Sequence, residues 1–133
     1  RTEVVDVEGV RVTKVFDFGR FRSNPMAPSF PHWLGRRAAG IDILHFHLPM
    51  PTAVLSYLLL KPPGKVIVHY HSDIIRQALL LKPYRPFLER FLNQVDRIIA
   101  TSPNYIKSSP FLNSRAEKCT VIPYASSCVK PNL

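Results

Sequence analysis

The chain has 133 residues, of which 46% are hydrophobic, and it carries a formal net charge of +9 with a pI near 10.0. This length and apolar content suffice for one domain with a sizeable core and argue against global disorder. No apolar run approaches the roughly 18 residues of a membrane-spanning helix, because the longest candidate, 48–60, contains two prolines. The two cysteines are too few for a disulfide framework, so we expect a reduced, cytoplasmic setting.

The excess of basic residues indicates attraction to polyanions, whether nucleic acid, anionic lipid headgroups or phosphorylated substrates. The charge alone does not choose among these partners, and a solvated basic surface is the ordinary alternative. Basic residues are densest in 19–25, 34–40 and 81–91, but none of these is a tight run typical of a localisation signal or a nucleic-acid-binding arm.

In chain order, polar and apolar residues first alternate over 9–18, which predicts a half-buried strand. Short apolar runs, typical of strands buried on both faces, then alternate with segments of helical spacing. The strands are predicted at 41–46, 65–70, 97–101 and 119–124, and the helices at 30–38, 51–60 and 84–95.

Strands that alternate with helices predict an α/β fold, here a Rossmann-like, doubly wound parallel sheet with flanking helices. In such sheets ligands bind outside the carboxyl ends of the strands. The predicted strand ends are unusually polar, and we expect them to form a site on one edge of the sheet. They are His45-Phe46-His47, His69-Tyr70-His71-Ser72-Asp73, Thr101-Ser102-Pro103-Asn104 and Pro123-Tyr124.

The histidines at two of these strand ends are potential metal ligands, and alternation points each pair to one face of its strand. HYHSD, beginning at His69, resembles the start of the HxHxDH signature of metallo-β-lactamases, but Ile74 stands where the last histidine should be. Histidines satisfied by backbone partners at strand ends are the more ordinary interpretation. We therefore expect no metal ligands and no cofactor, and a His/Asp metallohydrolase stays open as an alternative.

The turn TSPN, 101–104, predicts the start of a helix. Ser102 is suited to the N-cap and Pro103 to the first helical position, where its missing N–H is not needed. The free amides of such a helix would favour a phosphate or a polarised sugar hydroxyl at the strand-end site, although a capped helix that binds nothing is the more ordinary interpretation. The chain has no P-loop, no GxGxxG and no GxSxG elbow.

The chain carries five segments in an order typical of one enzyme family: DILHFHLPMP, KVIVHYHSDI, YRPFLERFLNQVDRIIATSPNY, SSPFL and KCTVIPY. From about Gly9 to Tyr124 it thus resembles the amino-terminal domain of a family 4 glycosyltransferase with the GT-B fold. The resemblance implies retaining, metal-independent transfer of a sugar from a nucleotide-sugar donor to an acceptor held largely by this domain. It also implies acceptors such as lipid-linked or cell-surface polysaccharide precursors.

The resemblance implies a role for particular residues as well. His71 falls on the family's histidine after the central strand, which contacts the donor sugar and helps to stabilise the transition state. Ser72 and Asp73 follow in the same loop and resemble acceptor or sugar contacts. The other implied substrate-binding residues are His47, Arg76, Ser102 and Asn104, of which Arg76 could equally be an ordinary surface residue.

Parts of the family pattern are missing from the chain. The family's first strand, with its glycine-rich loop, should precede it, and a nucleotide-binding domain should follow it. No two glutamates lie seven residues apart, so the family's donor-gripping acidic motif is elsewhere. We therefore interpret 1–124 as a partial amino-terminal, acceptor-side domain without its first strand and 125–133 as a diverged tail, and we expect the chain alone to be inactive.

Two alternative functions remain open besides the metallohydrolase: a basic module that binds nucleic acid, or one that binds membranes, without catalysis. The segment 19–37 interleaves arginines with Phe and Trp, as a headgroup-binding surface would, although we favour the interpretation that its apolar residues face the core and its arginines are solvated. We find no recognised nucleic-acid motif and expect no nucleic-acid partner. A peripheral position on the inner face of the cell membrane is thus compatible with the expected cytoplasmic location.

Overall fold

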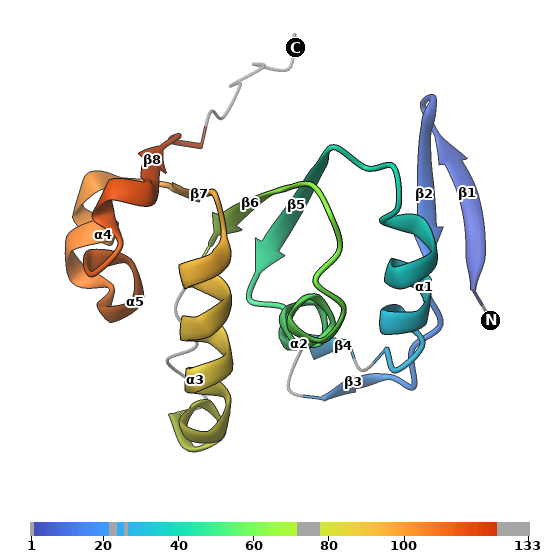
Figure 1. Ribbon diagram of the computed structural model, residues 1–133, viewed down its shortest axis with the longest axis horizontal. Helices are drawn as coiled ribbons and strands as arrows, with labels where there is room; N and C mark the ends of the chain where they lie inside the picture. Colours follow the sequence, from blue (N-terminus) through green and yellow to red (C-terminus); the bar gives the residue numbers. More distant parts are fainter. Residues whose placement is uncertain (1, 22–23, 26, 72–77, 125–133) are drawn as a thin grey trace, which may run out of the picture.

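A computed structural model describes residues 2–21, 24–25, 27–71 and 78–124 of the chain (Figure 1). Its centre is a four-stranded sheet in the order β5-β6-β7-β8, and every neighbouring pair is parallel. The strands are β5 (Ile43–Leu48), β6 (Lys65–Tyr70), β7 (Arg97–Ala100) and β8 (Cys119–Val121). The predicted α/β fold with a parallel sheet and flanking helices is therefore confirmed.

The helices that the structure describes pack on one face of this sheet. Strand order across the sheet equals strand order along the chain, so right-handed crossovers place each connecting helix on the same side. The expected doubly wound arrangement, with helices on both faces, is therefore wrong for the described part of the chain. The helices are α1 (Phe30–Arg37), α2 (Pro51–Leu60), α3 (Ala78–Gln94), α4 (Pro103–Ser108) and α5 (Pro110–Asn113), followed by the 3-10 helix η2 (Ala116–Lys118).

Burial along the strands also shows that only one face of the sheet is covered by the described helices. On β5 buried and exposed residues alternate strictly, and on β6 the residues between the buried ones are only half-buried. The covered face presents Leu44, Phe46, Leu48, Val66, Val68, Tyr70, Ile98 and Ala100 to the helices. The prediction that these strands are buried on both faces is wrong, because no helix in the described ranges lies over the second face.

Phe91 of α3 occupies the centre of the core and is fully buried. Its ring meets Phe46 of β5 edge-on at a centroid distance of 5.4 Å and Tyr57 of α2 at 5.2 Å. Such edge-to-face pairs are favourable beyond the apolar area that they bury. Phe91 therefore ties α2 and α3 to the sheet that carries the strand-end residues.

An antiparallel hairpin of β1 (Glu3–Val7) and β2 (Val10–Lys14) replaces the single strand predicted at 9–18. Glu8 and Gly9 form its turn with φ of 52° and 83°, as a two-residue hairpin turn with both central residues at positive φ requires. Figure 1 shows the hairpin beside α1, at the end of the molecule opposite to α4 and α5. A second ladder joins the two-residue strands β3 (Arg20–Phe21) and β4 (Asn24–Pro25).

Gly64, just before β6, should be intolerant of a side chain. Its φ is +104°, and an added Cβ would lie 2.6 Å from the backbone oxygen of Ile41. We expect Gly64→Ala to lower the free energy of unfolding by at least about 2 kcal/mol, measured by urea denaturation, because strain and a backbone clash add. Gly40→Ala is the matched control, since Gly40 also has a positive φ but has open space around it. Equal losses in the two variants would show that the clash is unimportant.

Asp96, which directly precedes β7, joins two strands at their amino-terminal ends. Its carboxylate accepts the N–H of Val66 at 2.8 Å and the Lys65 ammonium at 3.1 Å. The Val66 N–H, followed by the Lys65 side chain, holds the pKa of the Asp96 carboxyl below its ordinary value. The ionised form is thus favoured by folding, so its stabilisation is present above the unfolded pKa near 4 and is lost as pH falls through the lower folded pKa.

We expect Asp96→Asn to lower the free energy of unfolding at pH 7 by roughly 1 kcal/mol, because the substitution removes the charge from two hydrogen bonds. The loss should be no larger, because solvent screens this partly exposed site. The variant should also lose less stability than the parent when urea midpoints are compared from pH 6 down to pH 3. Glu3→Gln, at an exposed strand position, serves as the control. Parallel acid profiles for parent and Asp96→Asn would contradict the assignment.

Candidate functional site

Two of the predicted site residues meet at the carboxyl edge of the sheet. His47 is the penultimate residue of β5 and lies on the exposed face of that strand, and His71 directly follows β6. Nδ1 of His47 and Nε2 of His71 lie 2.8 Å apart, within hydrogen-bond distance. The His71 backbone N–H also donates to the Leu48 carbonyl at 3.2 Å, which continues the strand pairing and fixes where the imidazole emerges.

Tyr124 is the third member of this group. Its hydroxyl forms a short hydrogen bond with Nδ1 of His71, so both nitrogens of that imidazole are engaged. The two rings are nearly parallel, with centroids 6.0 Å apart. The sequence marks Tyr124 only as a predicted strand end, and no role was expected for it. The signal was its position after β8, at the same edge as the histidines.

His45 and His69 extend the pair into a histidine cluster, defined here as His45, His47, His69 and His71. The rings are stacked or tilted, with centroids 4.7 Å apart for His45 and His47 and 4.2 Å apart for His69 and His71. Burial, and then the neighbouring imidazoles, lower the pKa values of His45, His69 and His71. These three side chains are therefore predominantly neutral imidazoles near pH 7.

Ser102 begins α4 as predicted. Its Oγ accepts the backbone N–H of Tyr105 at 3.2 Å, and Pro103 is the first helical residue. The ring of Tyr105 lies 6.1 Å from that of Tyr70, so α4 stands beside the end of β6. Asn104 is exposed on α4. The hydrogen bond that the Ser102 side chain makes among the described residues is to Tyr105 within α4, so its link to the histidine cluster is its place along the same edge of the sheet.

The remaining predicted site residues are Ser72, Asp73 and Arg76, and they lie outside the described residues, as does the tail 125–133. The structure therefore brings together His47 and His71 of the predicted set.

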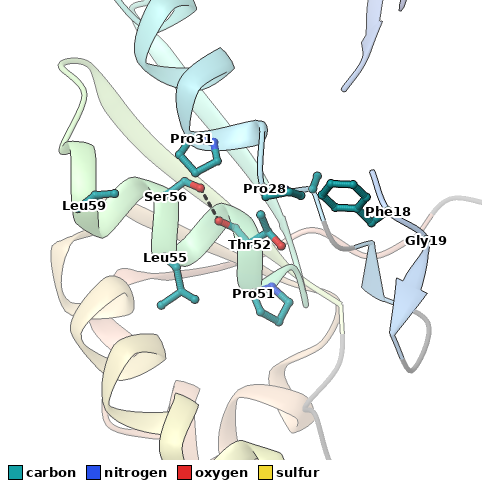
Figure 2. Close-up of a pocket in the computed structure, with 10 residues that line it drawn as sticks. Phe18, Gly19, Pro28, Pro31, Pro51, Thr52, Leu55, Ser56 and Leu59 are labelled. Atoms are coloured by element: carbon teal, nitrogen blue, oxygen red, sulfur yellow. Dashed lines mark hydrogen bonds between the residues drawn. The ribbon is translucent and has the colours of Figure 1, made fainter. Parts of the chain in front are cut away.

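An apolar groove of about 820 Å³ lies between α2 and the segment that leads into α1 (Figure 2). It was not predicted. Its lining is mostly apolar and includes three prolines and two leucines, and Leu59 and Phe18 are 75% and 76% exposed. The lining residues are Phe18, Gly19, Ala27, Pro28, Pro31, Pro51, Thr52, Leu55, Ser56 and Leu59.

Pro31 of α1 lines this groove, but the larger apolar residues of the helix face the core. Leu34 is buried, and Phe30 and Trp33 pack against the core cluster. Arg36 and Arg37 in the last turn of α1 are exposed. In the ranges that the structure covers, no helix combines the length and apolar character needed to cross a membrane.

Similarity to known proteins agrees with this geometry. D-rhamnosyltransferase WbpZ of Pseudomonas aeruginosa is 48% identical over 87 residues, which are 65% of this chain and 23% of that protein. O-antigen chain mannosyltransferase C of Escherichia coli is 45% identical over 83 residues, 62% of this chain and 22% of that protein. The matched part is thus less than a quarter of either relative. No solved structure matches the chain significantly.

The family described as Glycosyltransferase Family 4 matches residues 1–125, which include every described strand and helix. The match extends over the histidine cluster, Ser102 and Tyr124 alike, and it agrees with the parallel α/β sheet. The chain belongs to glycosyltransferase family 4.

Proposed function

We propose that the protein containing this chain transfers a sugar from a nucleotide-sugar donor to a glycan acceptor with retention of anomeric configuration. The observation that carries the proposal is the hydrogen-bonded pair of His47 and His71 at the carboxyl edge of the sheet. Ligands of parallel α/β sheets bind at this edge. Family membership supports glycosyl transfer as the reaction class, and the position of the histidine pair supports this edge as the proposed site of the reaction.

Glycosyl transfer requires polar groups that are oriented toward the reacting sugar. The bond from the anomeric carbon to the diphosphate oxygen breaks while positive charge develops on the sugar ring, so preorganised dipoles stabilise the transition state. His71 is held from both sides, by His47 and by Tyr124, before any substrate arrives. Tyr124 is 65% exposed. We propose that the donor sugar takes the place of its hydroxyl at Nδ1 of His71 while His47 keeps the ring in position.

Ser72, Asp73, Arg76, Ser102 and Asn104 complete the proposed substrate contacts. Ser72 and Asp73 follow His71 directly in the chain. Ser102 and Asn104 belong to the helix that starts at the end of the neighbouring strand. The proposal needs no metal ion and no cofactor in the transfer step.

The names of the relatives suggest a sugar class. One transfers D-rhamnose and the other mannose, and D-rhamnose is 6-deoxy-D-mannose, so both sugars carry an axial 2-hydroxyl. We propose a nucleotide-activated sugar of D-manno configuration as the donor and a surface-polysaccharide precursor as the acceptor.

We propose that the apolar groove contacts the lipid carrier of the acceptor or the membrane that holds this carrier. Exposed apolar residues there lie on α2, which ends at Leu60 just before Lys61. The first turn of α1 adds Pro31 to the groove, and its last turn carries the exposed Arg36 and Arg37. Apolar surface beside cations suits an anionic bilayer. Leu59→Glu should weaken co-sedimentation with vesicles containing anionic lipid, whereas Phe87→Glu, on exposed α3 surface outside the groove, should not. Binding that is absent even at low salt would contradict the membrane contact.

The test of the transfer function uses the full-length protein and a panel of nucleoside diphosphate sugars, with mannosyl, D-rhamnosyl and glucosyl donors. We expect acceptor-dependent release of the nucleoside diphosphate with a D-manno donor, undiminished by a metal chelator, and an α-linked donor should give an α-linked product by NMR. The 133-residue chain alone should be inactive under the same conditions. Turnover by that chain, or inversion at the anomeric carbon, would refute the corresponding part of the proposal.

A further inference from the structure

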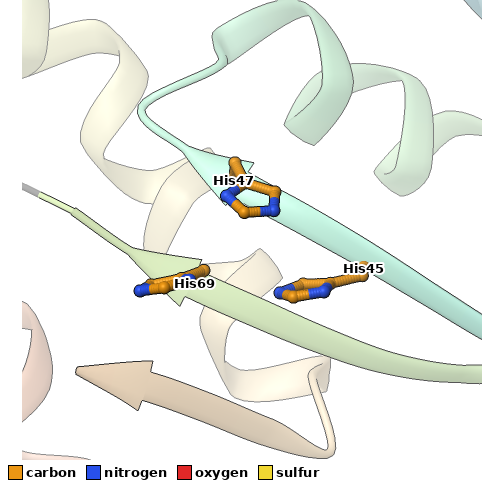
Figure 3. A group of neighbouring side chains, drawn as sticks. All are labelled: His45, His47 and His69. Carbon is orange, nitrogen blue, oxygen red and sulfur yellow. The ribbon is translucent and has the colours of Figure 1, made fainter. Parts of the chain in front are cut away.

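The imidazoles of His45, His47 and His69 lie close together on the face of β5 and β6 that the described helices leave uncovered (Figure 3). His45 and His47 alternate along β5 and so point to the same side, and the strand register places His69 of β6 directly beside His47. One ring nitrogen from each of the three lies within 4.8 Å of the other two. This convergence follows from the sheet itself and does not depend on the transferase proposal.

Three imidazoles are a ligand set that zinc uses in proteins, with a fourth position left for water or another ligand. Zinc–nitrogen bonds of about 2.1 Å in tetrahedral geometry bring ligand nitrogens to about 3.4 Å from one another. The observed spacing is wider by little more than 1 Å, which small side-chain rotations can close. His45 and His47 are exposed, so an ion can enter from solvent.

His69 provides a second, independent observation. Its Nε2 atom is buried and has no hydrogen-bond partner among the described residues. A buried polar atom without a partner is costly, and a bound ion would satisfy it. Ligation through Nε2 of His47 would leave its Nδ1 free to keep the hydrogen bond with His71, and zinc-binding histidines commonly have such an outer partner.

We propose that His45, His47 and His69 form a binding site for a divalent transition-metal ion of the zinc type. The site is separate from the transfer step, which needs no metal, although it shares His47 with the proposed sugar site. It departs from the sequence-based expectation of no metal ligands, because the sequence could not show that the β5 and β6 histidines share one face at adjoining positions.

The test is a titration of the tag-free full-length protein with Co²⁺ and with Zn²⁺. One equivalent of Co²⁺ should give the intense visible absorption of a four- or five-coordinate ion, and Zn²⁺ should displace it. His45→Ala and His69→Ala should each weaken metal binding by at least about tenfold. Mutating even a residue that only hydrogen-bonds a zinc ligand typically lowers metal affinity by roughly 10–100-fold. His32→Ala, which removes an exposed histidine of α1, should leave binding unchanged.

Circular dichroism and urea midpoints establish that each variant is folded, and His45→Gln repeats the test with a side chain of similar size. Absence of stoichiometric binding by the folded parent would overturn the proposal. So would binding that persists in a folded His45→Ala/His69→Ala double variant, or a loss of equal size in His32→Ala. Because the readout is metal binding, failure here leaves the transferase proposal untouched.

Discussion

Replacing Phe91 by alanine is expected to lower the free energy of unfolding by about 3–5 kcal/mol. The side chain is fully buried between α2, α3 and β5 and contacts the rings of Phe46 and Tyr57. Its loss removes both edge-to-face pairs and leaves a cavity that surrounding helices cannot fill without moving. Since total stabilities are about 5–15 kcal/mol, this loss is a large fraction of the total, and the urea midpoint should fall markedly. Urea denaturation followed by circular dichroism measures the effect.

Phe87→Ala is the matched control for this prediction. Phe87 lies one helical turn before Phe91 on α3 but is 47% exposed, so its removal should change stability by about 0.5 kcal/mol or less. Similar losses of unfolding free energy in Phe91→Ala and Phe87→Ala would mean that α3 does not pack on the core through the face that carries Phe91.

Replacing His71 by alanine in the full-length enzyme is expected to lower kcat by about 10²–10³, the usual cost of removing one preorganised transition-state dipole. KM for the donor should change much less, because the interaction strengthens as the glycosidic bond breaks. The side chain is exposed, so the variant should keep the parent's urea midpoint. Initial rates over a range of donor concentrations separate kcat from KM.

His47 should act as a positioning residue through its 2.8 Å contact with His71. His47→Ala should lower kcat by less than His71→Ala, and the double variant should be no slower than His71→Ala, since groups that act as a unit are not additive. His32→Ala is the control and should retain full activity. Additive losses in the double variant would show that the two histidines act separately.

The sequence predicts the parallel sheet and the meeting of His47 with His71 because both follow from local patterns and one general rule. Short, mostly apolar runs mark β5, β6 and β7. Parallel strands have their carboxyl ends on one edge, so polar residues at those ends become neighbours. The Ser102 cap was predictable for the same reason, since the Ser-Pro pair specifies a helix start by itself.

Features that depend on the order of strands across the sheet were not predictable. A single sequence does not show that β5, β6, β7 and β8 lie side by side in chain order, and this order puts the helices on one face. The other face therefore holds the half-exposed histidine cluster rather than a second core. The hairpin of β1 and β2 was missed because its turn uses Glu8 at positive φ instead of the usual Asn or Asp before glycine.

A crystal structure of the full-length enzyme with a non-hydrolysable nucleotide sugar of D-manno configuration would test the central claim most directly. The account predicts that the sugar lies against the carboxyl edge of β5 and β6, with a hydroxyl within hydrogen-bond distance of the His71 imidazole and His47 still in contact with that ring. A donor sugar bound at a site that touches neither histidine would contradict it.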